Sequence, residues 1–363
     1  MDKTRRNFIK KTSLATGALT FGVANGLSAQ SYRKIMGAND RVRVGIVGFS
    51  NRAKGALIPA FVGNQKNMNF EIVGVSDIWK RRREEGAAYI KEKAGNKAKM
   101  WRNNEEMYET NSIDAVIIST ADFQHALHTV QAANAKKDAY VEKPFAETME
   151  DARLGRKAVE ESGIVFQIGS QRRSGANYHA ANQYIKSGKF GDIIMVEMSW
   201  NVNQPGRWRL PKLTKEIRES DTDWKRYLMN RPYEAWDPRK YLEYRLFWPY
   251  SSGIPGQWMS HQIDTVHWFS GLDHPRSVAA NGGIYLWKDG RKNFDTMTAV
   301  FDYGETNNPK NGFQVVYSSR FTNSAGGTKE IYYSNGGELN LKTNKVSSNG
   351  GLSRGQAKRM GMD

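Results

Sequence analysis

The first part of the chain alternates short apolar runs with amphipathic stretches. Such alternation is typical of β-α units that build a parallel sheet covered by helices. The runs that predict strands are 42–47, 70–76, 113–119, 139–141 and 164–168, and the stretches that predict helices are 52–62, 80–93, 122–134 and 148–161. The pattern therefore predicts an α/β domain with a doubly wound parallel sheet, ending near residue 170.

After residue 170 the pattern changes to one helix followed by strands separated by Gly and Asn pairs. Pairs of this kind are typical of hairpins and favour an antiparallel sheet. The helix is predicted at 178–187, and the strands at 193–202, 277–287, 296–303, 313–321 and 329–341. Residues 171–363 are therefore predicted to form a C-terminal α+β domain with a mainly antiparallel, open sheet.

Residues 204–258 form a long, poorly periodic segment rich in Trp, Arg, Tyr and Pro. Loops of this length are usually functional or disordered. Disordered segments contain few aromatic residues, so we expect this segment to be ordered and functional.

The first residues of the chain carry a pattern of their own. Arg5 and Arg6 precede Phe8 and a mildly apolar stretch, 14–27, which is too short and too rich in glycine to span a bilayer permanently. This order is typical of a twin-arginine export signal. We expect residues 1–29 to be a signal peptide and the folded protein to reach the periplasm or another extracytoplasmic space. The alternative is a cytosolic protein with a basic N-terminus.

Composition narrows the function classes. Hydrophobic residues make up 39% of the chain and aromatic residues 11%, which excludes intrinsic disorder. The absence of cysteine excludes disulfides, zinc ribbons and thiol nucleophiles. The net charge of +17 favours acidic partners or serves solubility alone. No nucleic-acid motif and no cluster with metal-ligand spacing is found, so we expect neither nucleic acid nor metal.

A dinucleotide-binding turn is predicted where the first strand meets its helix. Gly48 permits the tight turn, and Ser50 and Ala53 stand where the fingerprint has its second and third small residues. Asp77 ends the second strand, where a carboxylate would accept hydrogen bonds from the adenosine ribose. This carboxylate favours NAD over NADP, although the basic run 80–83 partly offsets that preference. The candidate cofactor residues here are Gly48, Ser50, Asn51, Arg52 and Asp77.

The segment Glu142-Lys143-Pro144 follows the fourth predicted strand. Together with the turn at Gly48, it resembles the Gfo/Idh/MocA oxidoreductases, and the resemblance extends from about residue 41 to residue 341. It implies a Rossmann domain over 38–170, with Lys143 beside the nicotinamide and bonded to the reacting sugar hydroxyl, and a proline that is often cis. Further cofactor residues implied by the resemblance are Thr120, Asp122, His125, Glu142 and Lys143.

The resemblance also implies a catalytic histidine at His261. Dehydrogenases of the family place an Asp four residues before this histidine, but this chain has Gln257 there. Glutamine cannot ionise, so we expect Asp264, three residues further along the same helix face, to orient His261. His261 is then expected to titrate near neutrality and to complete a proton relay that Lys143 begins. The alternative is a histidine that only packs in the core.

The same domain is expected to hold the substrate. Residues 169–173 resemble the family's Gly-x-Gln-x-Arg stretch, and one of the two arginines is expected to face the cleft. Seven of the ten tryptophans lie between Trp200 and Trp268, interleaved with arginines. Flat aromatic faces beside planar hydrogen-bonding groups suit sugar rings, although these tryptophans could instead pack an interdomain or subunit interface. The candidate substrate residues are Arg172, Arg173, Tyr178, Trp258 and Asp264.

These features predict an exported, NAD-dependent oxidoreductase that transfers hydride at a sugar carbinol carbon. No free NAD pool is expected outside the cytoplasm, so the hydride has to return within the catalytic cycle. One alternative is an NAD-dependent glycosidase that oxidises, eliminates and reduces. A second is a non-catalytic sugar-binding relative, which the departure at Gln257 keeps open. We also expect a homo-oligomer, no permanent membrane span, and a chain truncated before a further C-terminal helix that the resemblance implies.

Overall fold

The computed structural model describes residues 41–110, 112–305, 308–351 and 354–359. The predicted signal peptide, residues 1–29, lies outside the described residues. Within the described part of the chain, every helix is too short or too polar to cross a membrane. The residues from Val42 onward form one compact unit that contains two sheets.

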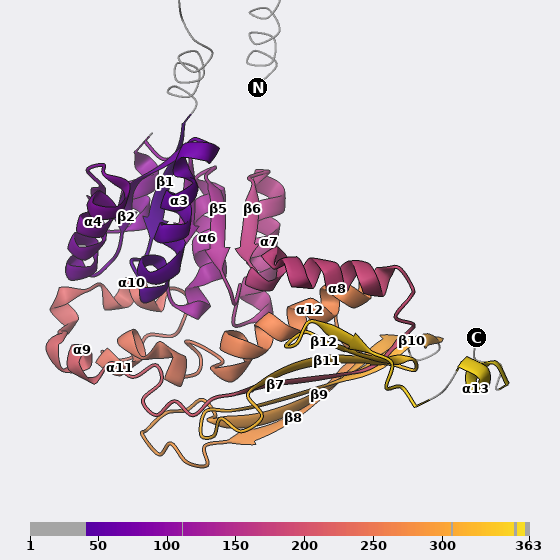
Figure 1. Ribbon diagram of the computed structural model, residues 1–363. Coiled ribbons are helices and arrows are strands. Elements are labelled where there is room, and N and C mark those ends of the chain that lie inside the picture. Colours follow the sequence, from indigo (N-terminus) through magenta and orange to yellow (C-terminus); the bar gives the residue numbers. More distant parts are fainter. Residues whose placement is uncertain (1–40, 111, 306–307, 352–353, 360–363) are drawn as a thin grey trace, which may run out of the picture. The chain divides into compact units, whose positions relative to one another are not determined.

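The first sheet has six strands, all parallel, in the order β3-β2-β1-β4-β5-β6 (Figure 1). This order reverses between β1 and β4, as in doubly wound folds, and it confirms the predicted fold class. The strands are β1 (Val42–Val47), β2 (Phe70–Ser76), β3 (Lys99–Trp101), β4 (Ala115–Ile118), β5 (Asp138–Glu142) and β6 (Phe166–Gly169).

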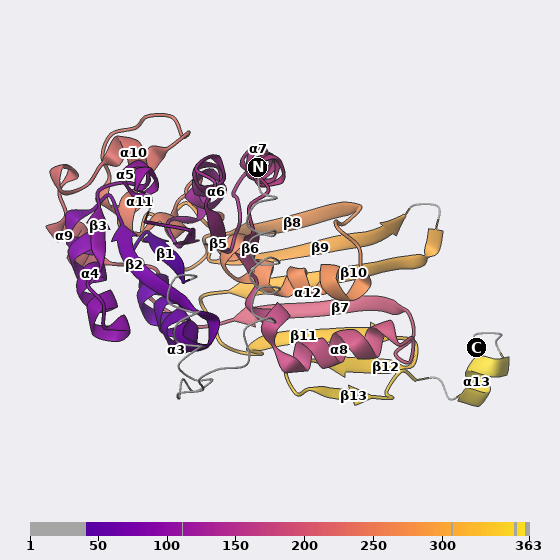
Figure 2. The same cartoon turned by 90° about the horizontal axis from the view of Figure 1, so that it is seen from above.

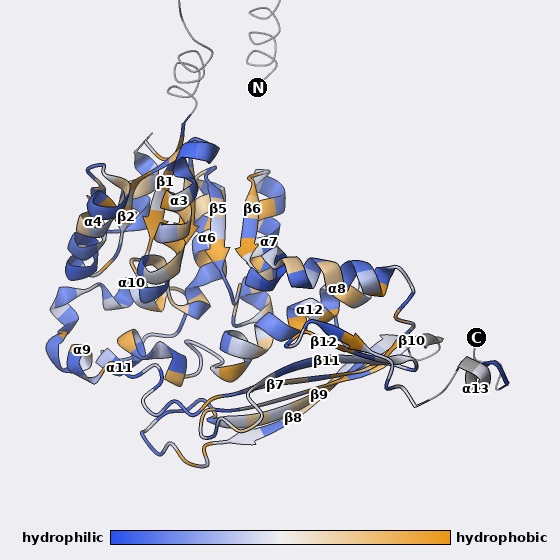
Figure 3. Cartoon of the chain, in the orientation of Figure 1, coloured by the Kyte–Doolittle hydropathy of each residue, from blue (hydrophilic) through white to orange (hydrophobic). Residues whose placement is uncertain are grey.

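Helices connect these strands. A helix following β5 illustrates how the sequence sets their ends: the Thr148 side chain accepts a hydrogen bond from the backbone of Asp151, and Gly163 stops the helix in a left-handed conformation. Solvent-facing helices such as α4 are largely hydrophilic (Figure 3). The helices are α3 (Ile58–Met68, after a π-helical turn Ala53–Leu57), α4 (Lys80–Ala94), α5 (Asn104–Glu109), α6 (His125–Asn134) and α7 (Met149–Ser162).

The second sheet has seven strands in the order β13-β12-β11-β7-β10-β9-β8. Only β7 and β10 pair in parallel among its described strands, so the predicted, mainly antiparallel character is confirmed. The run 329–341, predicted as one strand, is a hairpin of two. The strands are β7 (Ile193–Asn201), β8 (Ser277–Gly283), β9 (Thr296–Glu305), β10 (Asn308–Arg320), β11 (Thr328–Ser334), β12 (Gly337–Asn340) and β13 (Lys345–Ser347).

Two helices lie on one face of the second sheet, α8 (Ala176–Lys186) and α12 (Ser260–Ser270) (Figure 2). Their apolar side chains share a core with those of the central strands, including Val266 of α12, Val315 of β10 and Tyr332 of β11. Because α12 carries His261, this packing fixes where the predicted catalytic histidine lies. A last helix, α13, spans Arg354–Arg359.

The segment 204–258 is ordered, as expected. It contains the short helices α9 (Pro211–Glu216), α10 (Trp224–Leu228) and α11 (Pro238–Leu242). Its aromatic residues pack against the loop after β4: the rings of Tyr227 and Tyr250 contact Phe123 edge-on at 5.4 and 5.2 Å. The side chain of Gln124 donates to the backbone oxygen of Tyr227 at 2.7 Å. The segment is therefore anchored to the parallel-sheet domain.

Candidate active site

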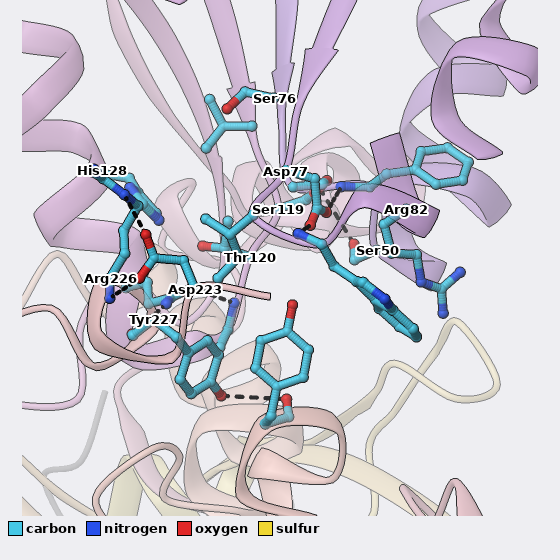
Figure 4. A pocket seen from close by; sticks show the side chains of 18 of the residues that line it. Ser50, Ser76, Asp77, Arg82, Ser119, Thr120, His128, Asp223, Arg226 and Tyr227 are labelled. Carbon is cyan, nitrogen blue, oxygen red and sulfur yellow. Dashed lines mark hydrogen bonds and ion pairs between the residues drawn. The ribbon is translucent and has the colours of Figure 1, made fainter. Parts of the chain in front are cut away.

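A cavity of about 660 Å³, called the cofactor cavity below, opens where β1, β2 and β4 end. Gly48, Asp77 and Ser119 follow these three strands directly and all line it. Tyr227 and Tyr241, from the segment 204–258, line it as well. Side chains from both parts of the chain are drawn around the cavity in Figure 4. Ligands of doubly wound folds bind at this edge of the sheet, where the strand order reverses.

The turn after β1 is held tightly against the end of β4. Gly48 has a φ of +82°, and a Cβ there would lie 2.7 Å from Cγ2 of Thr120. The Ser50 hydroxyl contacts that of Ser119 at 3.3 Å and accepts from the backbone of Ala53 at 3.2 Å. Ser50 thus closes the turn by hydrogen bonds where the fingerprint has a second glycine.

Asp77 is fixed by two backbone groups. Its Oδ2 accepts from the backbone N–H of Phe49 and its Oδ1 from that of Trp79, each at 2.9 Å. Burial raises the pKa of this carboxyl, although the two N–H bonds oppose the shift. Each oxygen retains a second lone pair for a ligand hydroxyl. Arg82, which also lines the cavity, pairs with Glu85 at 2.8 Å, so its charge is partly used within α4.

The cofactor cavity fits a dinucleotide. The Thr120 hydroxyl is buried there without a hydrogen-bond partner among the described residues. The cradle at Gly48 has no room for a side chain, and it leads into a helix, whose N-terminus is the kind of place that suits a diphosphate. Asp77 would hold the ribose. Six of the predicted cofactor residues line this cavity: Gly48, Ser50, Asn51, Arg52, Asp77 and Thr120.

A second cavity of about 290 Å³, called the substrate cavity below, adjoins the first. Both predicted catalytic residues, Lys143 and His261, line it. The remaining predicted cofactor residues, Asp122, His125, Glu142 and Lys143 itself, line this cavity and not the first. The residues that line both cavities are Ser50, Arg52, Ser119, Thr120 and Arg245.

Lys143 is the central cation of the substrate cavity. Its peptide bond to Pro144 is cis, and its Nζ donates to the backbone oxygens of Gln257 at 2.7 Å and Gly256 at 3.3 Å. Burial lowers the pKa of Lys143 to about 8, although the charge of Asp122 opposes the shift. An amine with this pKa exchanges protons readily near neutral pH.

Gln257 joins a carboxylate to an arginine. Its Nε2 donates to Oδ2 of Asp122 at 2.5 Å, and its Oε1 accepts from Nε of Arg245 at 2.8 Å. Asp122 also accepts from the Ser251 hydroxyl at 2.6 Å. Gln257 therefore stands where the resemblance expects a carboxylate, and it binds the carboxylate of Asp122 instead. Glu142, the other carboxylate lining the cavity, pairs with Arg52 at 2.9 Å.

Two further titratable groups lie behind Lys143. His125 is buried, and its Nδ1 lies 2.7 Å from the backbone oxygen of Pro144. Its Nε2 is buried without a partner among the described residues. Burial, and the nearby charge of Asp122, hold the pKa of Glu147 well above its usual range. Glu147 is therefore expected to be uncharged at neutral pH.

The structure corrects the expected behaviour of His261. Its ring lies 5.8 Å from that of Trp200, and it forms no hydrogen bond with any described residue. Burial and the charge of Lys143 lower its pKa to about 3, so it does not titrate near neutrality. Asp264 does not orient it, because that carboxylate accepts from Ser170 at 2.7 Å and pairs with Arg173 at 2.9 Å.

Of the predicted substrate residues, only Trp258 lines the substrate cavity. Arg172 pairs with the buried Glu330 at 3.0 Å, and the Tyr178 hydroxyl donates to the same carboxylate at 3.3 Å. Arg173 pairs with Asp264. These four predicted residues line neither cavity: Glu330 binds Arg172 and Tyr178, and Arg173 and Asp264 pair with each other.

The site residues that were not singled out as substrate residues come from distant parts of the chain. They are Gln171, Trp200, Arg207, Arg245 and Gln257. The interleaving of Trp and Arg between 200 and 268 was the signal that pointed to Trp200, Arg207 and Arg245. This signal does not distinguish the arginines that line the cavity from those that pair with carboxylates, because the pairing depends on residues far away in the sequence.

The N-terminal domain matches a known protein family. Residues 42–170 match the GFO_IDH_MocA family, described as "Oxidoreductase family, NAD-binding Rossmann fold". The predicted NAD-binding Rossmann domain is therefore confirmed.

Similarity to curated relatives covers part of the chain. A 1,5-anhydro-D-fructose reductase of Ensifer adhaerens is 32% identical over 162 residues, which are 42% of this chain and 48% of the relative. An inositol 2-dehydrogenase of Salmonella paratyphi B is 25% identical over 213 residues, 58% of this chain and 60% of the relative. The chain thus spans about half the length of these relatives.

Solved structures share the fold over most of the chain. The WlbA dehydrogenase of Bordetella pertussis, in complex with NADH and UDP-GlcNAcA, has a TM-score of 0.64 at 18% identity, covering 85% of this chain and 82% of that chain. A putative myo-inositol dehydrogenase of Sinorhizobium meliloti has a TM-score of 0.58 at 19% identity, covering 82% and 75%. At such identity the likeness shows the fold alone.

Proposed function

We propose that this chain, whose N-terminal domain belongs to the Gfo/Idh/MocA oxidoreductase family, is an NAD-dependent oxidoreductase that transfers hydride at a carbinol carbon of a saccharide. The observation that supports this most directly is the border between the two cavities. Five residues line both, and Lys143 lies in the smaller one. A ligand in the substrate cavity would therefore lie next to one in the cofactor cavity.

The chain's own residues supply the proton chemistry. Bound NAD would supply the hydride acceptor or donor. As hydride leaves a carbinol carbon, its hydroxyl loses a proton to a base within hydrogen-bonding distance. Lys143 is suited to take this proton because its pKa is about 8. The two backbone oxygens that bind Nζ hold the amine in place, and the charge of Asp122 stabilises the ammonium that forms.

A saccharide is the substrate class that the lining favours. The rings of Trp200 and Trp258 stack at 5.8 Å with an interplanar angle of 10°, and both line the substrate cavity. Flat aromatic surfaces beside many hydrogen-bond donors match a sugar, which has an apolar face and a polar rim. The names of the relatives, an anhydrofructose reductase and an inositol dehydrogenase, point to substrates of the same kind.

The test begins with the purified protein. We expect NAD to be released on denaturation, and the absorbance of reduced nicotinamide to change when a reactive sugar is added. Protein without bound NAD that also fails to bind added NAD would refute the proposal. With a panel of glycosides, an oxidoreductase yields oxidised sugar, a redox glycosidase yields net hydrolysis, and a non-catalytic relative yields neither product.

Export by the twin-arginine route is a further proposal, which rests on Arg5, Arg6 and the apolar stretch behind them. Replacing both arginines with lysine is expected to leave the full-length precursor in the cytoplasm. The measurement is fractionation followed by mass determination of the protein in each compartment. Normal export of the double variant in shortened form would contradict the signal.

A further inference from the structure

Seven arginines lie in the segment 204–258, and two of them differ from the others. Arg207 and Arg245 form no ion pair with any carboxylate of the described residues, and both line the substrate cavity. The arginines that do pair with carboxylates are Arg209, Arg218, Arg226, Arg231 and Arg239.

The bonds of these two side chains leave donors unused. Nη1 of Arg207 donates to Oε1 of Gln204 at 2.7 Å, and its guanidinium lies 5.7 Å from the ring centre of Trp258. Nε of Arg245 donates to Gln257 at 2.8 Å, and its guanidinium lies 4.6 Å from the ring centre of Tyr244. A guanidinium carries five N–H donors. Each group is thus oriented by an aromatic ring and retains N–H groups for a ligand.

The charges of the substrate cavity do not balance. Four side chains that line it are cationic at neutral pH, namely Arg52, Lys143, Arg207 and Arg245, against the carboxylates Asp122 and Glu142. Glu142 is paired with Arg52. Burial and the charge of Arg245 lower the pKa of Arg207, so the two guanidinium groups lie close enough to repel each other. An anion between them would relieve this repulsion.

We infer that the substrate cavity takes an anionic saccharide, whose carboxylate or sulfate group is bound by Arg207 and Arg245. This inference rests on the proposed function, which assigns the cavity to the substrate. Paired guanidinium forks match the geometry of an oxyanion, and such charge-assisted bonds are stronger than those to a neutral hydroxyl. The volume of about 290 Å³ lies at the small end of ligand cavities, which favours a single ring over a long oligosaccharide.

The test compares matched sugars by calorimetry on the NAD-loaded protein. Each pair consists of the methyl glycosides of a neutral sugar and of its uronate: glucose with glucuronate, galactose with galacturonate, and mannose with mannuronate. Glucose 6-sulfate is the sulfated sugar in the comparison. We expect at least one acidic sugar to bind about tenfold or more tightly than its neutral partner, because a hydrogen bond to a charged group contributes about 1.5–3 kcal/mol. A preference for the sulfate or for the uronate identifies which oxyanion the site takes.

Two variants test the assignment of residues. Arg207→Gln and Arg245→Gln are each expected to lower the affinity for the acidic sugar by a larger factor than the affinity for its neutral partner, so that most of the preference is lost. The matched control is Arg218→Gln, since Arg218 is an exposed arginine of the same segment that pairs with Asp221. Because Arg245 also lines the cofactor cavity, bound NAD is measured for every variant. Loss of NAD instead of acidic-sugar affinity in Arg245→Gln would overturn its assignment.

The remaining outcomes separate this inference from the proposed function. Equal binding of acidic and neutral sugars, with bound NAD and turnover, would overturn the anionic substrate and leave the oxidoreductase standing. Failure of every sugar to bind the NAD-loaded protein would count against both. A preference that Arg207→Gln does not alter would show that the oxyanion lies elsewhere.

Discussion

The cofactor cavity and the substrate cavity share a border but differ in how their charged side chains are paired. In the cofactor cavity, Asp77 accepts from two backbone N–H groups and Arg82 pairs with Glu85. In the substrate cavity, Arg207 and Arg245 have no carboxylate partner among the described residues, and His261 has no hydrogen bond there.

We therefore expect the first cavity to serve cofactor binding and the second to serve substrate selection and proton transfer. Groups that are satisfied before a ligand arrives form a rigid, preorganised surface, which suits a ligand that stays bound. Groups with unused donors, such as Arg207 and Arg245, or with a pKa close to neutrality, such as Lys143, store the capacity to recognise a substrate or move a proton. Changes in the cofactor cavity should therefore affect retention of NAD, and changes in the substrate cavity should affect turnover and selectivity.

The largest effect is expected from Lys143→Met, in the substrate cavity. Methionine keeps much of the length of the side chain and removes the nitrogen that accepts the proton. We expect turnover to fall by about 10³-fold or more, within the range that acid–base groups supply, while NAD stays bound. The measurement is single-turnover hydride transfer, with NAD content determined on the same sample.

A surface lysine provides the control for this variant. Lys157, on α7, is 71% exposed and forms only a loose ion pair with Glu161 at 3.8 Å. Lys157→Met should change neither turnover nor NAD content. Full activity in Lys143→Met would show that another group accepts the proton.

The same division explains how much could be predicted from the sequence. Strands β1 and β2 have the predicted bounds, because buried parallel strands are nearly continuous apolar runs. Strand β3 was missed because it is a three-residue edge strand with two exposed residues. The turn at Asn335-Gly336 splits the predicted last strand into a hairpin, since β11 and β12 pair antiparallel there.

The cofactor cavity was predictable because its residues follow strand ends, so that local sequence reports their place. The substrate cavity depends on partners far along the chain. One of Arg172 and Arg173 was expected to face the cleft, but Glu330 on β11 binds the first and Asp264 on α12 binds the second. Arg207 lines the cavity, and it forms no ion pair with a carboxylate of the described residues. Whether an arginine pairs with a carboxylate or lines the cavity depends on tertiary packing, which the local sequence does not report.

The next largest effect is expected in the cofactor cavity, from Asp77→Ala. The change removes the acceptor of the Phe49 and Trp79 N–H groups together with the proposed ribose ligand. Leaving buried N–H groups unpaired and losing a charged acceptor costs a few kcal/mol, so affinity for NAD should fall by about 100-fold. NAD titrations followed by fluorescence measure this.

Turnover gives the contrast for Asp77→Ala. At saturating NAD, its rate of hydride transfer should approach that of the unaltered protein, because Lys143 and Asp122 are unchanged. If affinity for NADP rises at the same time, the carboxylate also excludes the 2′-phosphate. NAD affinity equal to that of the unaltered protein would refute the ribose assignment.

A smaller effect is expected from Gln257→Glu, which tests why a neutral side chain occupies the position beside Asp122. The substitution replaces the N–H donor to Asp122 by an oxygen and brings two carboxyl groups into contact. One of them must then take up a proton in the folded state. The free energy of unfolding should fall by about 1–3 kcal/mol at pH 8.

The pH dependence of this loss has a definite sign. A carboxyl whose folded-state pKa is raised binds more protons when folded than when unfolded, so the loss of stability should shrink as pH falls toward 5. Urea unfolding at both pH values measures it. Gln183→Glu, at an exposed position of α8, is the control and should be neutral. Stability of Gln257→Glu equal to that control would show that Asp122 needs no donor from position 257.

The smallest effect is expected from His261, because its ring has no hydrogen-bond partner among the described residues and no near-neutral pKa. Burial keeps the imidazole neutral down to a pKa of about 3, so it can contribute a hydrogen bond and a ring face but no titration between pH 5 and 8. His261→Ala should lower kcat/KM by about tenfold or less, the contribution of one hydrogen bond. The pH profile of sugar oxidation should rise through the pKa of Lys143, about 8, and then level, with no second limb near pH 6.5.

His261→Phe separates the two contributions, since phenylalanine keeps the ring beside Trp200 and removes the nitrogens. Activity retained in His261→Phe but lost in His261→Ala would show that only the ring face of His261 contributes. Equal losses in the two variants would show that a ring nitrogen contributes. A pH profile with a limb near neutrality that disappears in both variants would show that His261 is the proton relay after all.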